Sequence, residues 1–322
     1  MTFFEFIAAE YAPRVVGHNQ PAGGPGGRAD VAVPGGRRVP MAVAFRCLPV
    51  SRSGYYAWRR RVTGQHRSAR AQRAADLLVA VTAVHADHDG TYGSPRVTAQ
   101  LRDQGWVVTE RTVAGVMAAH GIAGISPRSF HPPTTRHDPA AMVPPDLVGR
   151  DFDRGRLDAV WASDITYLST GQGPVYLCAV RDEHSKHVLG WAAADHMRAS
   201  LVTTCLDMAA ATRRRSVSGT IFHADRGTQY TSGQVAETCH TLGLAQSVGR
   251  TGVCWDNACS ESFWSIFKHE YYFRHTFATR AELYRAIDKW MVYYNTRRRH
   301  SSNGQRSPLA YEAGLTGHPL AA

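Results

Sequence analysis

The chain has 322 residues, 43% of them hydrophobic, which is enough for two compact domains with buried cores. Its formal net charge of +11 favours a polyanionic partner, with nucleic acid first and an anionic membrane surface second. No apolar run reaches the roughly 20 residues of a membrane-spanning helix, and the first residues lack the basic stretch and cleavage site of a secretion signal. The six cysteines include no C-x-x-C pair, so we expect reduced thiols in a cytoplasmic protein and no zinc framework.

The N-terminal part of the chain divides into a segment without periodicity and a helical region. Residues 12–40 are rich in Gly, Pro and Arg, so we expect 1–45 to be a poorly ordered N-terminal segment. Helical patterns follow from 46 to 125, with a first clear apolar stripe over residues 68–87. The sequence therefore predicts a small all-helical domain ahead of the rest of the chain.

Two short helices joined by a tight turn are predicted at the end of this helical region. Ser94 suits an N-cap, a proline follows it, and the helix should stop near Gly105. The second helix is predicted to end at Gly121. Such a pair indicates a helix-turn-helix-like DNA-binding region with Arg96 and Arg111 as DNA contacts, although a plain helical hairpin fits the pattern equally well.

The second half of the chain alternates between strand and helix patterns. Residues 126–155 are rich in proline and are predicted to form an extended linker to a core over 156–315. Within that core, strands are predicted over 160–168, 175–180, 188–193, 220–223 and 244–248, and helices over 199–212, 234–242, 257–272 and 280–297. Three consecutive strands followed by alternating helices and strands predict an α/β fold with a five-stranded mixed sheet flanked by helices, in the order of a ribonuclease-H-like core.

Three acidic residues, each inside a short distinctive motif, are the candidate catalytic residues. Asp164 lies in a strand-like run, Asp225 follows a short apolar strand, and Glu261 lies in the first turn of a predicted helix. Their separations are 225 − 164 = 61 and 261 − 225 = 36 positions. Because the first and fourth strands are neighbours in a ribonuclease-H-like sheet, that fold would bring the three carboxylates together.

A triad of carboxylates has a specific chemical use. Its oxygens suit Mg²⁺ or Mn²⁺ in a two-metal site, which clamps the attacking and leaving oxygens of a phosphodiester. Without the ions, three close carboxylates would repel one another and raise at least one pKa. Alone, Asp225 could simply form a turn and Glu261 could complement a helix dipole. The joint pattern favours catalysis.

Basic and polar residues around the triad supply further candidates. Lys268 follows Glu261 by 268 − 261 = 7 positions, about two turns along the same helix face, and could contact DNA beside the site. His223 and Asn257 are candidates for supporting positions behind the carboxylates, although a buried, satisfied histidine fits nearly as well. A phosphate-binding cluster is predicted at the end of the last helix, made of Asn295, Arg298, Arg299 and His300. By contrast, Arg213 to Arg215 are interpreted as a solvated helix end.

These motifs together resemble one family of bacterial proteins. The markers in chain order are Ser51-Arg-Ser-Gly-Tyr-Tyr-Ala-Trp58, Tyr92-Gly-Ser-Pro-Arg96, Trp161-x-x-Asp164, Gly190-Trp191, His223-x-Asp225-Arg-Gly-x-Gln-Tyr230, Asp256-Asn-Ala258, Glu261-Ser-Phe263, Lys268, and Tyr294-Asn-x-x-Arg-Arg-His300. From about Cys47 to Tyr311, the chain is similar to DDE transposases of bacterial insertion sequences, of the OrfB type with a retroviral-integrase-type core.

The resemblance implies a metal-dependent nuclease and strand transferase that acts at the terminal inverted repeats of its element and inserts it into target DNA. By resemblance, Asp164, Asp225 and Glu261 take the metal-ligand roles. It also implies a homo-oligomer on DNA, a nucleoid-associated location in the cytoplasm, and in some members a fusion to an upstream-frame DNA-binding protein. No membrane partner is expected.

Two alternatives stay open at this point. A nuclease of the same fold could cut DNA without joining strands, and a degenerate relic or regulator could bind DNA through the helix-turn-helix region without catalysis. Three departures from the family pattern bear on activity: the Gly/Pro-rich insert over 12–40, Ala224 where Ser or Thr is usual, and Asn303 to Gln305 in place of a more apolar run.

Overall fold

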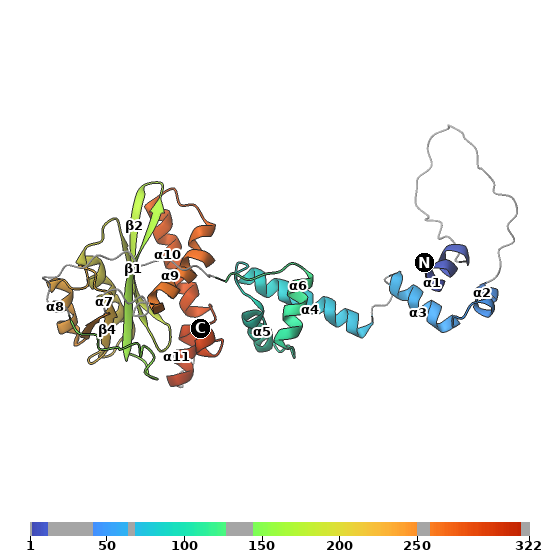
Figure 1. Cartoon of the computed structure of the whole chain (residues 1–322), viewed down its shortest axis with the longest axis horizontal. Coiled ribbons are helices and arrows are strands. Elements are labelled where there is room, and N and C mark those ends of the chain that lie inside the picture. Colours follow the sequence, from blue (N-terminus) through green and yellow to red (C-terminus); the bar gives the residue numbers. More distant parts are fainter. Residues whose placement is uncertain (1, 12–40, 64–67, 127–143, 250–257, 317–322) are drawn as a thin grey trace, which may run out of the picture. The chain divides into compact units, whose positions relative to one another are not determined.

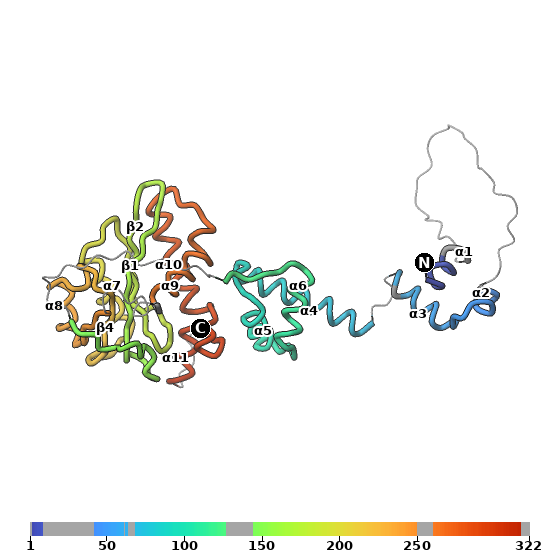
Figure 2. Tube along the Cα trace, in the orientation of Figure 1, coloured from blue at the N-terminus to red at the C-terminus, as the bar shows by residue number. Residues whose placement is uncertain are grey.

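The structure is a computed structural model that describes residues 2–11, 41–63, 68–126, 144–249 and 258–316 (Figure 2). The chain divides into two compact units, Met1–Ala80 and Val81–Ala322. No helix in these described ranges is long and apolar enough to cross a membrane.

The first unit is a small cluster of helices around aromatic side chains. Its helices are α1 (Phe3–Tyr11), α2 (Met41–Cys47), α3 (Arg52–Val62) and the first half of α4 (Ala69–Asp87). Ile7, Ala44 and Tyr55 are buried at its centre and are surrounded by further aromatic rings. The prediction of a poorly ordered segment over 1–45 is therefore wrong for α1 and α2, whose apolar side chains share this core; residues 12–40 lie outside the described ranges.

The second unit begins with the helix pair that the sequence predicts. The end of α4 is followed by α5 (Ser94–Asp103) and α6 (Glu110–Ala119). The N-cap of α5 is Gly93 rather than Ser94, and no side chain caps that helix. Because the two compact units divide at Ala80, the predicted helical region over 46–125 is not one domain.

A five-stranded mixed sheet forms the centre of the second unit (Figure 1). Its elements are β1 (Val160–Thr170), β2 (Gly173–Asp182), β3 (Val188–Ala194), α7 (Ala199–Arg213), β4 (Ile221–Ala224), α8 (Gly233–Leu242), β5 (Ala245–Val248), α9 (Ala258–Glu270), α10 (Arg280–Thr296) and α11 (Pro308–Thr316). The strand order is β3-β2-β1-β4-β5. β1 pairs antiparallel with β2 and parallel with β4, so the predicted mixed sheet and its order are confirmed.

Helices cover both faces of the sheet, as Figure 1 shows. On one face α7 and α8 enclose a core that includes Trp161, Val180 and Phe222. Gly190 permits this packing, because a Cβ there would lie 2.2 Å from the carbonyl oxygen of Cys205 on α7. On the other face α9 and α10 bury a second, aromatic-rich core.

The last part of the predicted linker belongs to the core. Val148 is buried against β1 and β4, and the backbone N–H of Leu147 donates to the hydroxyl of Ser247, which lies on β5. Residues 144–155 are thus packed along the edge of the sheet rather than extended, because their apolar side chains meet a strand edge; residues 127–143 lie outside the described ranges.

Candidate active site

Strand pairing sets Asp164 and Asp225 side by side. In the parallel ladder, Val160 pairs with Ile221 and Ala162 pairs with His223, a constant offset of 61 positions. The two aspartates are also 225 − 164 = 61 positions apart, so the ladder brings Asp225, directly after β4, level with Asp164 on β1. The sequence spacing of the two residues is therefore the register of two neighbouring strands.

Glu261 and Lys268 come to the same place on α9. This helix lies on the sheet through Phe263, Trp264 and Phe267, which are buried in the aromatic-rich core. Phe263 and Trp264 also line a small cavity together with Asp164. Glu261 is in the exposed first turn of α9, and Lys268 is half-buried two turns further on.

The pKa of Asp164 responds to the three charged groups around it. Burial, followed by the charges of Asp225 and Glu261, raises the pKa of Asp164 to about 7, against the opposing effect of Lys268. Burial also raises the pKa of Asp225. The pKa of Lys268 is lowered by burial, which the negative charge of Asp164 only partly offsets. The site thus holds more negative charge than its own side chains neutralise.

The donor set fits a hard divalent cation. Carboxylate oxygens are the preferred ligands of Mg²⁺ and Mn²⁺, and a cation between Asp164 and Asp225 would relieve the repulsion that raises the pKa of Asp164. Among the described residues, no three His, Cys, Asp or Glu side chains are close enough to share one ion. Glu261 therefore lies within electrostatic reach of Asp164 but outside a closed triad.

The turn after β4 holds the Asp225 carboxylate in place. Its Oδ1 accepts a hydrogen bond of 2.8 Å from the backbone N–H of Gly227. A Cβ at Gly227 would lie 2.8 Å from that same oxygen, so a larger residue would displace the carboxylate. Arg226 donates to the carbonyl oxygen of Gly249 at 2.7 Å and ties the turn to the end of β5. The Asp-Arg-Gly sequence is thus explained by the local geometry.

Family models match both the helix-turn-helix-like helices and the sheet-containing core. Two family models described as "Integrase core domain" match residues 156–254 and 242–308, and one described as "HTH-like domain" matches 72–130. A transposase for insertion sequence element IS629 of Shigella sonnei is 35% identical over 272 residues, 83% of this chain and 90% of that protein. Transposase InsF for insertion sequence IS3A of Escherichia coli is 35% identical over 268 residues, 83% of this chain and 92% of that protein.

The chain belongs to the insertion-sequence transposases. Its enzyme class is accordingly that of a polynucleotidyl transferase acting on DNA, and the resemblance stated from the motifs is confirmed. A transposase for insertion sequence element IS904 of Lactococcus lactis is 33% identical over 72% of this chain and 91% of that protein. Among solved structures, the catalytic core domain of BIV integrase covers 50% of this chain and 98% of its own, with 17% identity and a TM-score of 0.36.

In this transposase the predicted phosphate-binding cluster is engaged within the protein. Arg298 is 1% exposed and pairs with Glu270, and His300 is buried beside it. Asn295 is buried and exchanges hydrogen bonds with the backbone of Val188. In this conformation none of these three residues presents its polar atoms to a phosphate, and their role as DNA contacts stays a prediction.

The remaining predicted DNA contacts divide into paired and exposed residues. Arg96 pairs with Glu270 at 3.1 Å, and Arg299 pairs with Asp103. Arg111 is exposed in the first turn of α6. Of the predicted contacts outside α9, Arg111 is thus the one whose exposure fits DNA binding directly.

His223 and Asn257 were predicted to support the carboxylates, and Arg213 was predicted to be solvated. His223 is buried, with its Nδ1 2.9 Å from the hydroxyl of Ser247 and its ring edge-on to Phe152. Asn257 lies outside the described ranges. Arg213 is not solvated as predicted: it is buried in an ion-pair network with three acidic residues, namely Asp158, Asp182 and Glu312.

One charged residue of the second unit is absent from the sequence-based candidates. Glu270, at the end of α9, is 3% exposed and accepts hydrogen bonds from two arginines. No motif marks it, since its partners Arg96 and Arg298 lie 270 − 96 = 174 and 298 − 270 = 28 positions away. The only local signal is the position of this glutamate, one turn after the apolar residues of α9, which could have indicated that it is buried.

Proposed function

We propose that Asp164, Asp225 and Glu261 are the catalytic residues of this transposase and bind Mg²⁺ or Mn²⁺ as a two-metal site. The observation that carries the proposal is the strand register, which aligns two half-buried carboxylates 61 positions apart. Support comes from the pKa of Asp164, which burial and the charges of Asp225 and Glu261 raise to about 7. Such crowding of like charges is the expected state of a cation site considered without its cation.

The reaction would be cleavage that frees a DNA 3′ end at the terminal inverted repeats, followed by attack of that 3′-hydroxyl on target DNA. When bound, the divalent ions would activate water or the 3′-hydroxyl and neutralise charge on the phosphodiester. Asp164 and Asp225 would supply fixed oxygens from the sheet, and Glu261 would supply the oxygen that closes the site from α9. No covalent protein intermediate is needed.

Lys268 would hold the DNA phosphate next to the carboxylates. Its ammonium lies close enough to Asp164 for each charge to change the other's pKa. Within the described residues it forms no ion pair, so one of its N–H groups is available to a phosphate oxygen. A cation in this position attracts the substrate and orients the scissile bond.

The main electrostatic contact with DNA would come from the first unit rather than from the core. Residues 41–80 contain eight arginines and one aspartate, a charge of 8 − 1 = +7 out of +11 for the whole chain. On α3, Arg52 and Arg60 are exposed and Arg59 is half-buried, all within two helical turns. These residues would track the phosphate backbone without reading bases.

The partners follow from this chemistry. We propose that the transposase works in the cytoplasm, at the nucleoid, as a homo-oligomer that pairs the two ends of its element. An upstream-frame DNA-binding protein, separate or fused, would supply recognition of the inverted repeats.

The proposal is tested with oligonucleotides that carry the ends of the element, in the presence of Mg²⁺ or Mn²⁺. Wild-type protein should produce nicked and joined strands, and Glu261→Gln should produce neither. The matched control is Glu237→Gln, because Glu237 is exposed on α8, which covers the opposite face of the sheet. Cutting without joining would leave a hydrolase, and equal products from both variants would contradict the triad.

A further inference from the structure

Three consecutive arginines follow α10 and connect three different elements. Each pairs with one acidic residue: Arg297 with Asp87 at the end of α4, Arg298 with Glu270 at the end of α9, and Arg299 with Asp103 at the end of α5. The arginine segment therefore joins the helix-turn-helix-like helices to the helix that carries Glu261. This junction is outside the site described above.

Glu270 is the centre of the junction. Its Oε2 accepts a hydrogen bond of 2.6 Å from Nε of Arg298, and its Oε1 accepts one of 2.7 Å from Nη2 of the same side chain. Oε1 also accepts a bond of 3.1 Å from Nη1 of Arg96. Burial alone would raise the pKa of Glu270, but Arg298 and Arg96 outweigh burial and lower it. The carboxylate is charged and held in one orientation.

Arg96 is built into this arrangement from α5. Its guanidinium lies over the ring of Tyr92, 5.3 Å from the centroid, and Tyr92 stacks on His88 at 3.8 Å. The hydroxyl of Tyr92 in turn accepts a bond of 2.8 Å from the backbone N–H of Arg299. Arg96 is thus the one side chain by which α5 reaches the Glu270 carboxylate in the described structure.

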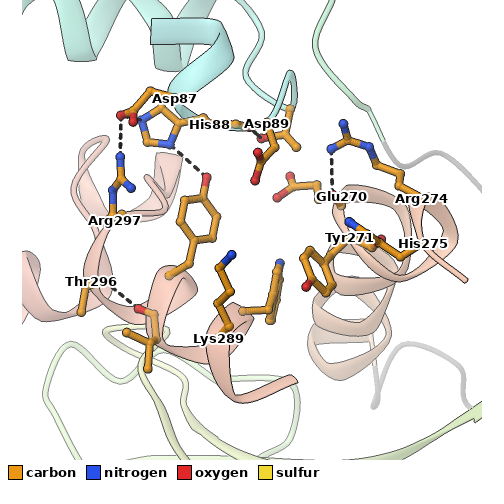
Figure 3. Close-up of a pocket in the computed structure, with 14 residues that line it drawn as sticks. Asp87, His88, Asp89, Glu270, Tyr271, Arg274, His275, Lys289, Thr296 and Arg297 are labelled. Atoms are coloured by element: carbon orange, nitrogen blue, oxygen red, sulfur yellow. Dashed lines mark hydrogen bonds and ion pairs between the residues drawn. The ribbon is translucent and has the colours of Figure 1, made fainter. Parts of the chain in front are cut away.

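The junction depends on these polar contacts because apolar packing is incomplete beside it. A cavity of about 480 Å³ separates the end of α4 from α9 and α10 (Figure 3). Figure 3 shows charged side chains around it, among them Asp89, Arg274 and Lys289. Close packing normally fixes the angle between elements. Here the forked hydrogen bonds of Arg298 and the single hydrogen bond of Arg96 do so in its place.

Glu270 and Glu261 are on the same helix, 270 − 261 = 9 positions apart, which is about two and a half turns. The aromatic packing of α9 involves Phe263, Trp264 and Phe267, all before its last turn, and Glu270 adds directional hydrogen bonds at that end of the helix. A directional clamp at one end of α9 therefore sets the place of Glu261 and Lys268 at the site.

We propose that Arg96 is a positioning residue for catalysis: by clamping Glu270 it fixes α9 and so couples the helix-turn-helix-like helices to the carboxylate Glu261. This inference rests on the proposed function of the triad. It assigns to Arg96 a role in the reaction without contact to substrate or metal. Movement of α5 on DNA would reach α9 directly through this contact, beside the indirect route from Asp103 through Arg299 and Arg298.

The test compares Arg96→Met and Arg96→Lys with wild type in the full chain. The matched control is Arg280→Met, since Arg280 also forms one ion pair, with Asp195 at 3.0 Å, and is 32% exposed against 25% for Arg96. Hydrogen exchange of the α9 amides and Mn²⁺ binding followed by electron paramagnetic resonance are read on each variant. Circular dichroism and DNA affinity establish that each variant is folded.

For Arg96→Met we expect faster amide exchange in α9, Mn²⁺ binding weakened by about tenfold, and an equal shift in the Mn²⁺ concentration that half-activates cleavage. DNA affinity should stay within about twofold of wild type, a small change on the free-energy scale. Arg96→Lys should recover part of the loss because it keeps the charge but not the planar guanidinium that lies over Tyr92, and Arg280→Met should match wild type.

Unchanged α9 exchange together with unchanged Mn²⁺ binding in Arg96→Met would overturn the inference. A loss of activity at every Mn²⁺ concentration with the same half-activation point would also overturn it, since that pattern marks a smaller folded fraction. A different result would show that the proposed function itself is wrong: wild type would then bind no Mn²⁺ and cut no DNA. In that case the amide exchange of α9 would still show whether Arg96 holds the helix. If Arg96→Met is unfolded, Arg96→Lys decides by the same readouts.

Discussion

The two sides of the site are positioned by different kinds of interaction. On the sheet side, Asp164 and Asp225 are set by the parallel ladder of β1 and β4, whose bonds are formed by backbone atoms. On the helix side, Glu261 depends on α9, whose far end is held by the side chains of Arg96 and Arg298. Backbone ladders survive most substitutions, whereas a side-chain clamp is lost with one residue. Sequence changes and DNA binding can therefore alter the position of Glu261 more easily than the positions of Asp164 and Asp225.

The largest effect is expected from the sheet side. Asp164→Asn should lower the rate of DNA cleavage by at least about a thousandfold, because it removes a charged ligand from a site that works electrostatically. Without divalent ions the same variant should melt at a higher temperature than wild type, because burial and the charges of Asp225 and Glu261 disfavour the ionised Asp164. Asp207→Asn, an exposed change on α7, is the control. A variant that cuts at the wild-type rate would remove Asp164 from the mechanism.

On the helix side, breaking the clamp at its centre should reduce stability. Glu270→Gln leaves the buried guanidinium of Arg298 without its counter-charge, at a cost of about 3–5 kcal/mol in the free energy of unfolding. Urea denaturation measures this loss against the exposed control Glu237→Gln. The double variant Glu270→Leu, Arg298→Met should recover most of it, because apolar residues need no partner. Equal stability of Glu270→Gln and the control would show that the ion pairs of Glu270 do not contribute to the free energy of unfolding.

The carboxylate of Glu312 on α11 gives a comparison outside the site, because it is held by ion pairs with His187 and Arg213. Burial would raise the pKa of Glu312, but the neighbouring His187 and Arg213 outweigh burial and lower it to about 2 from 4.5. A depressed pKa stabilises the fold above pH 4.5, and this stability, roughly 3 kcal/mol for a shift of this size, is lost as the pH falls toward 2.

Chemical denaturation between pH 5 and pH 2.5 should therefore show a smaller loss in Glu312→Gln than in wild type, on the order of 2 kcal/mol of difference. Parallel curves for the two proteins would contradict the role of Glu312.

The smallest effect concerns DNA contacts in the first unit. If Arg52, Arg59 and Arg60 each neutralise one phosphate, replacing all three by Gln should reduce the slope of log affinity against log salt by up to about 2.7. Fluorescence anisotropy on duplex DNA measures the slope. The control replaces the same residues by Lys, which keeps the charge and should keep the slope. An unchanged slope in the Gln variant would move the interface elsewhere.

The sheet was predictable because each strand has a recognisable local pattern of apolar residues. The register of β1 and β4 is also visible in the sequence, as a spacing between two acidic residues. The 61-position gap between Asp164 and Asp225 is the same number as the offset of the β1–β4 ladder. The helix that carries Glu261 was likewise predicted, over residues 257–272, from its sequence pattern. In these elements local pattern and final structure agree.

The arginine cluster was not predictable in the same way. Arg298 and Arg299 lie in a dense basic run, which in isolation is typical of phosphate binding. Their partners Glu270 and Asp103 are 298 − 270 = 28 and 299 − 103 = 196 positions away, so no local window contains both members of a pair. Whether such charges are buried depends on how whole helices and strands pack together. The spacing of residues along one helix carries no information about that packing. α1 and α2 were missed for a related reason, because their core forms with α3 across a long intervening segment.

The two-metal site is tested most directly by anomalous diffraction from crystals of the full chain soaked in Mn²⁺. We expect density for Mn²⁺ between the carboxylates of Asp164 and Asp225, with Glu261 as a further ligand from α9. Density at that position in wild type, absent from Asp164→Asn, would establish the site. Mn²⁺ bound elsewhere, or at this position with Glu261 turned away in the presence of DNA, would contradict it.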